Sequence, residues 1–476
     1  MIAVVFPLTW FLLPIAASGG EAPCVRPTRP GTQVQGEVRV CPGRYRIADR
    51  REQGIIIAAA SGTRIDLAGV ILESGDSIAS RFVGAGVVSR GVDRVTITGG
   101  DIQGFRYGIR LEGGRGHRVT GTDLSGSRSH SVRSTPARPD SADQLDLLRP
   151  EIFEAYGGGI LLKRTTGVSI TGVISRGAQN GIALMEVRDG YIADNDLAMN
   201  NGWGVHLWRS SRNVIARNRA NSTRRCESQL PAADCGAAAI LLRDASDSNT
   251  IVDNDVTASS LGLLIAGEHR GTRPSVGNLV IRNDGSFALR TAFASFFGWS
   301  NTFLGNRADS VSIGFRLDHS GGSMLQGNTV IGARTAAVVS EHGSDNVILA
   351  NVLMGGPIGI RVAAPARTGD LSRQYRIDDN VLSRLDQGIV IEHTTGARVR
   401  GNVFDGVGDG LVIDGAGHGS EVTGNVFLKA SRWFIEAPDL AAGGNYWATA
   451  DARAATAKVK GRISILPWNP ASDAGY

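Results

Sequence analysis

The chain has 476 residues, of which 42% are hydrophobic and only 6% are aromatic. Its 63 glycines far outnumber its 14 phenylalanines and 5 methionines, a composition typical of many short strands joined by tight turns. The formal net charge of +5 is modest for this length, and the sequence has no basic stripe with interleaved aromatic residues, which argues against a nucleic-acid-binding protein.

The N-terminus is predicted to be an export signal that occupies residues 1–22. An apolar stretch that begins at Met1 is followed by small residues of the kind that a signal peptidase accepts. The stretch is too short to span a membrane comfortably, so we expect a secreted or periplasmic protein with no membrane span in the mature chain. The four cysteines form two local pairs, Cys24 with Cys41 and Cys226 with Cys235, and export favours a disulfide in each pair.

A short motif, Gly-Asn-Val or a close variant, recurs along the chain. Its asparagines lie 22 or 23 residues apart except at three longer intervals, which indicate insertions. They are Asn195, Asn218, Asn254, Asn283, Asn306, Asn328, Asn351, Asn380, Asn402 and Asn425. A second element, Gly-Ile-x-Leu-x, lies between the asparagines, as in residues 108–112 and 204–208. Both elements alternate apolar with variable residues, as half-buried strands do.

A coil of about 22 residues cannot bury its own apolar face, but coils stacked at ~4.8 Å form a continuous core. The repeat therefore predicts an all-β parallel β-helix solenoid. A leucine-rich horseshoe is the main competitor, but the sequence lacks its fixed leucines and its helix per repeat. We expect the repeated asparagines to take the left-handed conformation and to hydrogen-bond from coil to coil.

Residues 50 to 447 resemble the repeats of the pectate-lyase-like superfamily, which implies a right-handed parallel β-helix. The run Gly443-Gly-Asn-Tyr-Trp447 is similar to the closing motif of the periplasmic copper-site maturation proteins of nitrous oxide reductase, which share this solenoid. The superfamily includes lyases, epimerases, glycoside hydrolases, adhesins and accessory proteins. The resemblance therefore implies the scaffold and leaves the activity open.

The predicted solenoid has a cap at each end. Residues 23–90 are expected to form an N-terminal cap with the first coils, residues 91–447 the β-helix, and residues 448–476 a C-terminal cap that covers the last sheet edge. Insertions near 127–156 and 222–236 both enter just before a Gly-Ile-x-Leu strand. We therefore expect both to rise from the same edge of the solenoid, where loops usually bind ligands.

The outward positions of the strands between these insertions are predicted to form a binding site for an acidic polysaccharide. Arginine and lysine pair with carboxylates, an aromatic ring stacks on a sugar, and histidine transfers protons near neutral pH. The predicted catalytic residues are His206, Arg209, Glu186, Arg243 and Asp244, and the predicted substrate-binding residues are Lys163, Arg164, Trp208 and Tyr156. The plain alternative is a solvated sheet face with ordinary cross-strand charge pairs.

A second cluster, formed by Asp318, His319, Glu341 and His342, is the alternative site. Carboxylates on neighbouring coils could act as acid and base in glycoside hydrolysis, or could bind a divalent metal together with the histidines. The Asp-Pro-His-Glu run of alginate epimerases is absent from the sequence.

The function predicted from these residues is that of a lyase or epimerase acting on a uronate-containing polysaccharide. The alternatives are a glycoside hydrolase on the same scaffold, and a non-enzymatic periplasmic or surface protein that binds glycans or assists a copper site. The scarcity of methionine argues against the copper version. We expect a monomer without a metal or cofactor, with calcium as the alternative.

Overall fold

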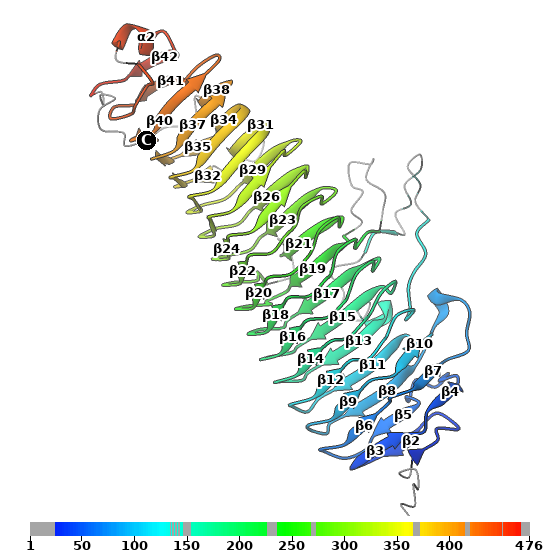
Figure 1. Ribbon diagram of the computed structural model, residues 1–476. Helices are drawn as coiled ribbons and strands as arrows, with labels where there is room; N and C mark the ends of the chain where they lie inside the picture. Colours follow the sequence, from blue (N-terminus) through cyan, green and yellow to red (C-terminus); the bar gives the residue numbers. More distant parts are fainter. Residues whose placement is uncertain are drawn as a thin grey trace, which may run out of the picture.

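The computed structural model describes residues 24–133, 135, 138, 140, 143–145, 154–225, 236–267, 273–364, 372–414, 419–449 and 451–467. The chain forms a long, straight stack of coils, from β1–β3 at one end to α2 (Ala452–Thr456) at the other (Figure 1). Strands of successive coils pair in parallel. The predicted right-handed parallel β-helix is confirmed. No helix in these residues is long and apolar enough to cross a membrane.

One face of the solenoid, called sheet A here, is a continuous sheet of 16 short strands. Its members are β1 (Cys24–Val25), β3 (Glu37–Val40), β6 (Arg64–Asp66), β9 (Thr96–Thr98), β12 (Arg118–Thr120), β14 (Ser169–Thr171), β16 (Tyr191–Ala193), β18 (Val214–Ala216), β20 (Thr250–Val252), β22 (Leu279–Ile281), β24 (Thr302–Leu304), β27 (Met324–Gln326), β30 (Val347–Leu349), β33 (Arg376–Asp378), β36 (Arg398–Arg400) and β39 (Glu421–Thr423).

The second face, called sheet B here, consists mostly of six-residue strands, which include the Gly-Ile-x-Leu elements. Its members are β2 (Thr32–Val34), β5 (Ile56–Ala58), β8 (Ala85–Arg90), β11 (Tyr107–Glu112), β13 (Gly158–Lys163), β15 (Asn180–Met185), β17 (Trp203–Trp208), β19 (Ala238–Arg243), β21 (Leu261–Ala266), β23 (Thr291–Phe296), β26 (Ile313–Asp318), β29 (Ala336–Glu341), β31 (Val352–Ala363), β34 (Val381–Glu392), β38 (Asp409–Ile413), β41 (Ile435–Ala441) and β42 (Val459–Ser464).

The third face is less regular. Its strands are β4 (Gly43–Arg46), β7 (Val70–Glu73), β10 (Asp101–Gln103), β25 (Arg307–Asp309), β28 (Thr329–Ile331), β37 (Val403–Val407) and β40 (Val426–Ala430), while β31 and β34 extend into it from sheet B. Single bridges such as Asp196↔Arg219 continue this face where no strand forms. The remaining elements are η1 (Ala79–Arg81), β32 (Ser372–Arg373) and β35 (Thr394–Thr395).

The repeated asparagines form the predicted ladder inside the solenoid. The side chain of Asn306, for example, accepts from Asn283 and donates to Asn328, at 3.1 Å in each case. The ladder ends at Asn445, which accepts from Asn425. The predicted left-handed conformation of the asparagines is wrong, because the residue before each asparagine takes it instead, as Gly305 does with φ 63°. The asparagine then follows the turn and directs its amide inward.

The closing motif has a physical role at the end of the core. The ring of Trp447 is fully buried and stacks on Phe427, which in turn stacks on Phe404, with ring centroids 5.0 and 4.7 Å apart. Beyond this stack, β42 pairs with β41 in parallel. The aromatic rings therefore fill the last coils of the core, where the solenoid ends.

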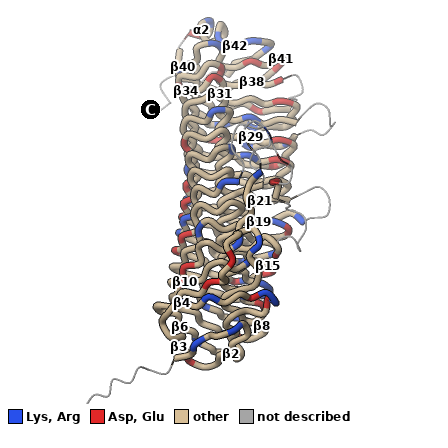
Figure 2. Tube along the Cα trace, turned by 90° about the vertical axis from the view of Figure 1, so that its right-hand side faces the viewer, with Lys and Arg blue, Asp and Glu red and all other residues tan. Residues whose placement is uncertain are grey.

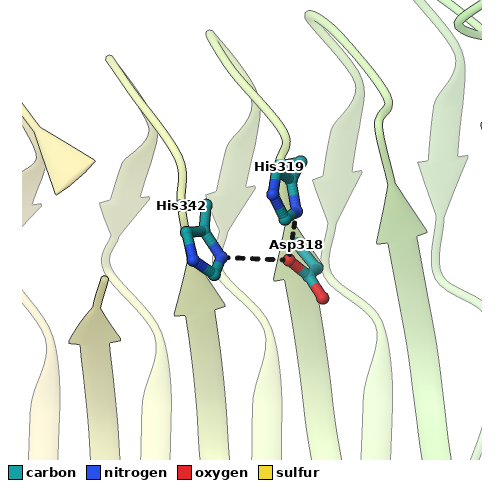
Figure 3. Close-up of side chains that lie close together, drawn as sticks. All are labelled: Asp318, His319 and His342. Atoms are coloured by element: carbon teal, nitrogen blue, oxygen red, sulfur yellow. Dashed lines mark hydrogen bonds and ion pairs between the residues drawn. The ribbon is translucent and has the colours of Figure 1, made fainter. Parts of the chain in front are cut away.

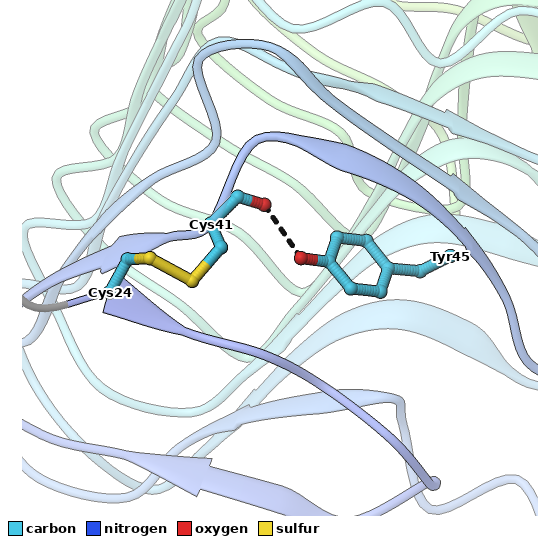
Figure 4. The surroundings of a disulfide bond; sticks show 3 residues. All are labelled: Cys24, Cys41 and Tyr45. Carbon is cyan, nitrogen blue, oxygen red and sulfur yellow. Dashed lines mark hydrogen bonds between the residues drawn. A yellow bond between two sulfur atoms is a disulfide. The ribbon is translucent and has the colours of Figure 1, made fainter.

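A disulfide between Cys24 and Cys41 joins β1 to the end of β3 (Figure 4). The Tyr45 hydroxyl donates a hydrogen bond of 2.7 Å to the Cys41 carbonyl. This predicted disulfide is confirmed, and it closes the first coil. The predicted pair Cys226 and Cys235 lies outside the described residues.

Candidate functional site

The residue that directly follows a strand of sheet B usually adopts the left-handed conformation, with φ between 46° and 57° at eight such positions. These eight positions are called the turn row here: Arg164, Glu186, Arg209, Asp244, Phe297, His319, His342 and His393. Residues other than glycine rarely take this conformation. Because the strands are in register, the turn row runs along one edge of the solenoid and brings side chains from successive coils together.

Three side chains of the predicted alternative cluster meet on neighbouring coils. His319 Nδ1 lies 2.7 Å from Asp318 Oδ1, and His342 Nδ1 lies 3.7 Å from the same oxygen. Figure 3 shows both rings directed toward Asp318 at the ends of adjacent strands. Within the described part of the chain, this is the one group of three or more histidine, cysteine or acidic side chains whose ligand atoms all lie within 4.8 Å of one another.

Glu341, the fourth residue of the predicted cluster, lies in a separate row of ion pairs. Its carboxylate accepts from Arg316 at 3.1 Å and from Arg361 at 3.2 Å. Arg316 also lies 3.4 Å from Asp318. The guanidinium of Arg316 thus holds Asp318 beside the histidines, while Glu341 is engaged by two arginines.

A cavity of about 350 Å³ opens beside the two histidines, and Pro274, Phe297 and Trp299 line its apolar part. The ring of His319 is stacked between Phe297 and His342, with centroid distances of 4.6 and 4.3 Å. Both ring nitrogens of His342 are buried and accept or donate no hydrogen bond to a described residue. Two stacked imidazoles therefore line one small cavity, and the Asp318 carboxylate lies beside both of them.

The predicted polysaccharide patch is partly buried, and the expectation that its outward positions face solvent is wrong for His206, Trp208 and Arg243. His206 and Trp208 are only 1% and 4% exposed, and Arg243 is buried as well. By register, His206 belongs to an outward row whose neighbours are Ala183 and Leu241.

Residues of the first insertion cover this outward row. Leu145 packs in one apolar cluster with Trp203 and Leu241, and Tyr156 contacts the Trp203 ring edge-on at 5.6 Å. Desolvation, with a smaller contribution from Arg243, holds the pKa of His206 well below its usual range. His206 is therefore a neutral core residue at neutral pH.

The other predicted patch residues lie at the edge of sheet B. Lys163 forms an ion pair with Glu154, and Arg209 pairs with Asp244 at 2.6 Å while its guanidinium lies over the Trp208 ring. Met185 and Trp208 pack in a small apolar cluster beneath them. Of the nine predicted residues, Arg164, Glu186 and Arg209 line an open pocket of about 510 Å³, called the basic pocket here. Its other lining residues are Thr165, Thr166, Arg188 and Arg273.

Comparison with known protein families decides the relationship of the chain. The model of the family described as "Periplasmic copper-binding protein (NosD)" matches residues 71–291 and 275–454. The chain belongs to the NosD family. Its matched residues include both pockets and the Asp318, His319 and His342 cluster.

Solved structures similar to this NosD-family chain are also β-helix proteins, and at these identities they show the fold alone. The A-module of the Azotobacter vinelandii mannuronan C-5 epimerase AlgE6 has 13% identity and a TM-score of 0.44, over 82% of this chain and 90% of that one. The Streptococcus pneumoniae surface protein and adhesin PfbA has 13% identity and a TM-score of 0.42, over 86% and 91%. Comparison with curated proteins gives no significant match.

The residues at the cluster fit the metal that the family description implies. Imidazole nitrogen suits copper(II) and zinc, and a carboxylate completes a nitrogen and oxygen donor set. Calcium, by contrast, takes six to eight oxygen ligands, and the cluster has one carboxylate. Asp318, His319 and His342 would hold the ion, and three protein ligands would leave further coordination positions open to water or a small ligand.

Sequence reasoning missed Arg188, Arg273, Pro274 and Trp299. None of them lies in a Gly-Ile-x-Leu strand, the element whose outward positions were predicted to carry functional side chains. Bridges between successive coils, such as Thr166↔Arg188 and Val276↔Trp299, place Arg188 and Trp299 in a row of their own beside the turn row. Counting residues from the end of each strand would have predicted this second row.

Proposed function

We propose that this protein is an exported metal-binding β-helix protein that holds a copper(II) ion at Asp318, His319 and His342. The observation that carries the proposal is the convergence of these three ligand atoms within 4.8 Å beside a cavity. The periplasmic, copper-binding description of the NosD family supports both the location and the metal, and the Cys24–Cys41 disulfide is consistent with export.

The cluster's own hydrogen bonding determines how it would take up a metal ion. His319 Nδ1 is hydrogen-bonded to Asp318, and this contact must open or be shared when both groups turn toward an ion. His342 has no such bond to lose, so its imidazole is the most prepared ligand. Ligating histidines must be neutral, so protons compete with the ion for both rings.

Calorimetric titration of the purified chain with copper(II) and with zinc tests the proposal, with electron paramagnetic resonance reporting nitrogen ligands to copper. We expect one ion per chain in the wild type. The His342→Gln substitution should lower affinity about a hundredfold or more, because loss of a supporting residue alone typically costs 10- to 100-fold.

His393→Gln is the matched control for this titration. His393 occupies the same turn row, but its ring is paired with Asp414 at 3.0 Å, away from the cluster. This variant should bind the ion as the wild type does. A wild type that binds no stoichiometric ion, or a His342 variant with unchanged affinity, would refute the proposal.

The lyase or epimerase activity predicted from the sequence, and the glycoside hydrolase alternative, stay predictions. The basic pocket supports binding of an acidic polysaccharide. Turnover through His206 has less support, because that ring is buried and its pKa is far below the range useful for proton transfer. The assay is an incubation with uronate polysaccharides, in which absorbance reports unsaturated products and reducing ends report hydrolysis.

A further inference from the structure

The basic pocket brings four arginines and one carboxylate, that of Glu186, to a single site. Several arginines elsewhere along the solenoid are paired with an aspartate on a neighbouring coil, as in Arg212 with Asp189, Arg217 with Asp194 and Arg282 with Asp253. Figure 2 shows the two signs of charge distributed along the whole length of the molecule. Paired charges of this kind give a surface little attraction for an anion.

The arginines of the basic pocket are paired differently. Arg209 has Asp244 as its partner, but the side chains of Arg164, Arg188 and Arg273 form no ion pair with any residue that the structure describes. All three are exposed at the mouth of one pocket of about 510 Å³. Guanidinium groups arranged in this way are suited to bidentate recognition of carboxylates and other oxyanions.

Glu186 limits which class of anion the basic pocket can bind. Its side chain lines the same pocket and forms no hydrogen bond or ion pair with a described residue. A carboxylate accepts hydrogen bonds and repels other anions. A ligand that carries only phosphates would be opposed by Glu186, whereas one that carries both carboxylates and hydroxyl donors can satisfy the arginines and Glu186 together. Acidic sugars have this combination.

The pocket also continues toward an exposed aromatic surface. Arg273 lines the basic pocket, and the next residue, Pro274, lines the cavity that contains Phe297 and Trp299. Trp299 is 46% exposed, so its ring is available to stack on a sugar. Three coils separate Arg209 from Phe297 in the turn row, or about 14 Å at the usual strand spacing. This length suits an oligomer rather than a single sugar.

We propose that the basic pocket binds a segment of an acidic polysaccharide. Uronate carboxylates pair with Arg164, Arg188 and Arg273, a sugar hydroxyl donates to Glu186, and the chain continues toward Trp299. This site is independent of the metal proposed at Asp318, His319 and His342, and it requires no turnover.

The test compares three probes by calorimetry: a uronic acid oligosaccharide, a polyphosphate of matched charge, and a neutral glucan oligomer. The wild type should bind the uronate oligomer and should not bind the neutral one. Arg188→Gln should weaken uronate binding about tenfold or more, as expected for a charge-assisted hydrogen bond. Arg400→Gln, which removes an exposed arginine from sheet A, should leave binding unchanged.

Glu186→Met separates the proposal from simple charge attraction. It removes the charge and both acceptor oxygens with little change in length. We expect uronate binding to weaken several-fold and polyphosphate binding to strengthen. If the variant binds both anions more tightly, or if the wild type binds polyphosphate as well as uronate, the site is a general anion site and the proposal is refuted.

One further variant locates the ligand. Trp299→Ala should weaken binding of a long uronate oligomer and leave a disaccharide unaffected. Uronate binding by the wild type should be the same with and without a metal chelator, so failure of the metal proposal would be distinguishable from failure of this one. A wild type that binds no uronate oligomer of any length would overturn the proposal.

Discussion

Replacing Asn306 with alanine removes one step of the internal ladder. The Asn306 amide accepts from the backbone N–H and the side chain of Asn283, at 2.9 and 3.1 Å. It donates to the Val280 carbonyl at 2.8 Å and to Asn328 at 3.1 Å. All of these groups are buried, so the methyl group of alanine would leave several of them without a partner.

The expected loss in the free energy of unfolding follows from these contacts. The Asn283 N–H would be left without this acceptor in the core, which costs about 1 to 3 kcal/mol. Loss of the Val280 and side-chain hydrogen bonds adds about 0.5 to 1.5 kcal/mol each. Because the remaining ladder asparagines keep other partners, we expect a total loss of about 3 to 5 kcal/mol in the free energy of unfolding.

The assay is urea unfolding followed by circular dichroism, with hydrogen exchange and mass spectrometry on the segment that contains Asn283. The Asn283 amide should exchange faster in the variant. Asn221→Ala is the control, because Asn221 is only partly buried and makes a single hydrogen bond to Asp255. A loss of less than about 1 kcal/mol for Asn306→Ala, equal to the control, would refute the idea that the ladder stabilises the coils.

Three further predictions concern pH and the chain ends. The pKa of His206 lies far below that of an unfolded histidine, so only the unfolded state binds a proton at this residue as the pH falls below about 6.5. The free energy of unfolding should therefore decrease by up to about 1.4 kcal/mol per pH unit. His206→Leu should flatten a profile of melting temperature against pH, and an unaltered slope would contradict this. Cys24→Ser should lower the free energy of unfolding by up to about 3 kcal/mol and should open mainly the first coil. Hydrogen exchange in residues 24–41 should therefore be faster in the variant, and exchange as slow as in the wild type would count against the prediction. Arg282→Ala breaks an exposed pair with Asp253 and should leave stability nearly unchanged, so a clear loss in urea unfolding would show that surface pairs matter more than we infer.

The spacing of the asparagines was sufficient to predict the fold, because a constant interval fixes both the coil length and the register. The second ladder was missed. Asn213, Asn249, Asn278 and Asn301 form it, with Asn278 accepting from Asn249 at 3.0 Å. Ser323 takes the next position and Asn346 the one after it, so this run of asparagines is shorter than the first and is interrupted by a serine.

The site was predicted only in part. Register brings Asp318, His319 and His342 together, because His319 and His342 directly follow the paired residues Asp318 and Glu341 on adjacent coils, and sequence counting could find them. Alternation along a strand could not show that His206 is covered, because Leu145, from an insertion more than fifty residues away in the sequence, packs in one cluster with Trp203, whose ring contacts His206. Long-range cover of this kind depends on the path of a loop, which periodicity does not describe.

The uniform rise of the coils restricts how the spacing between the basic pocket and Trp299 can change during evolution. Substitutions can alter the side chains at either position, but the strands between them stay hydrogen-bonded at a fixed separation. Only the gain or loss of a whole coil moves the two apart or together, in steps of about 4.8 Å. Relatives of this protein should therefore differ in the length of ligand they accept by discrete increments, each matching an insertion or deletion of about 22 residues.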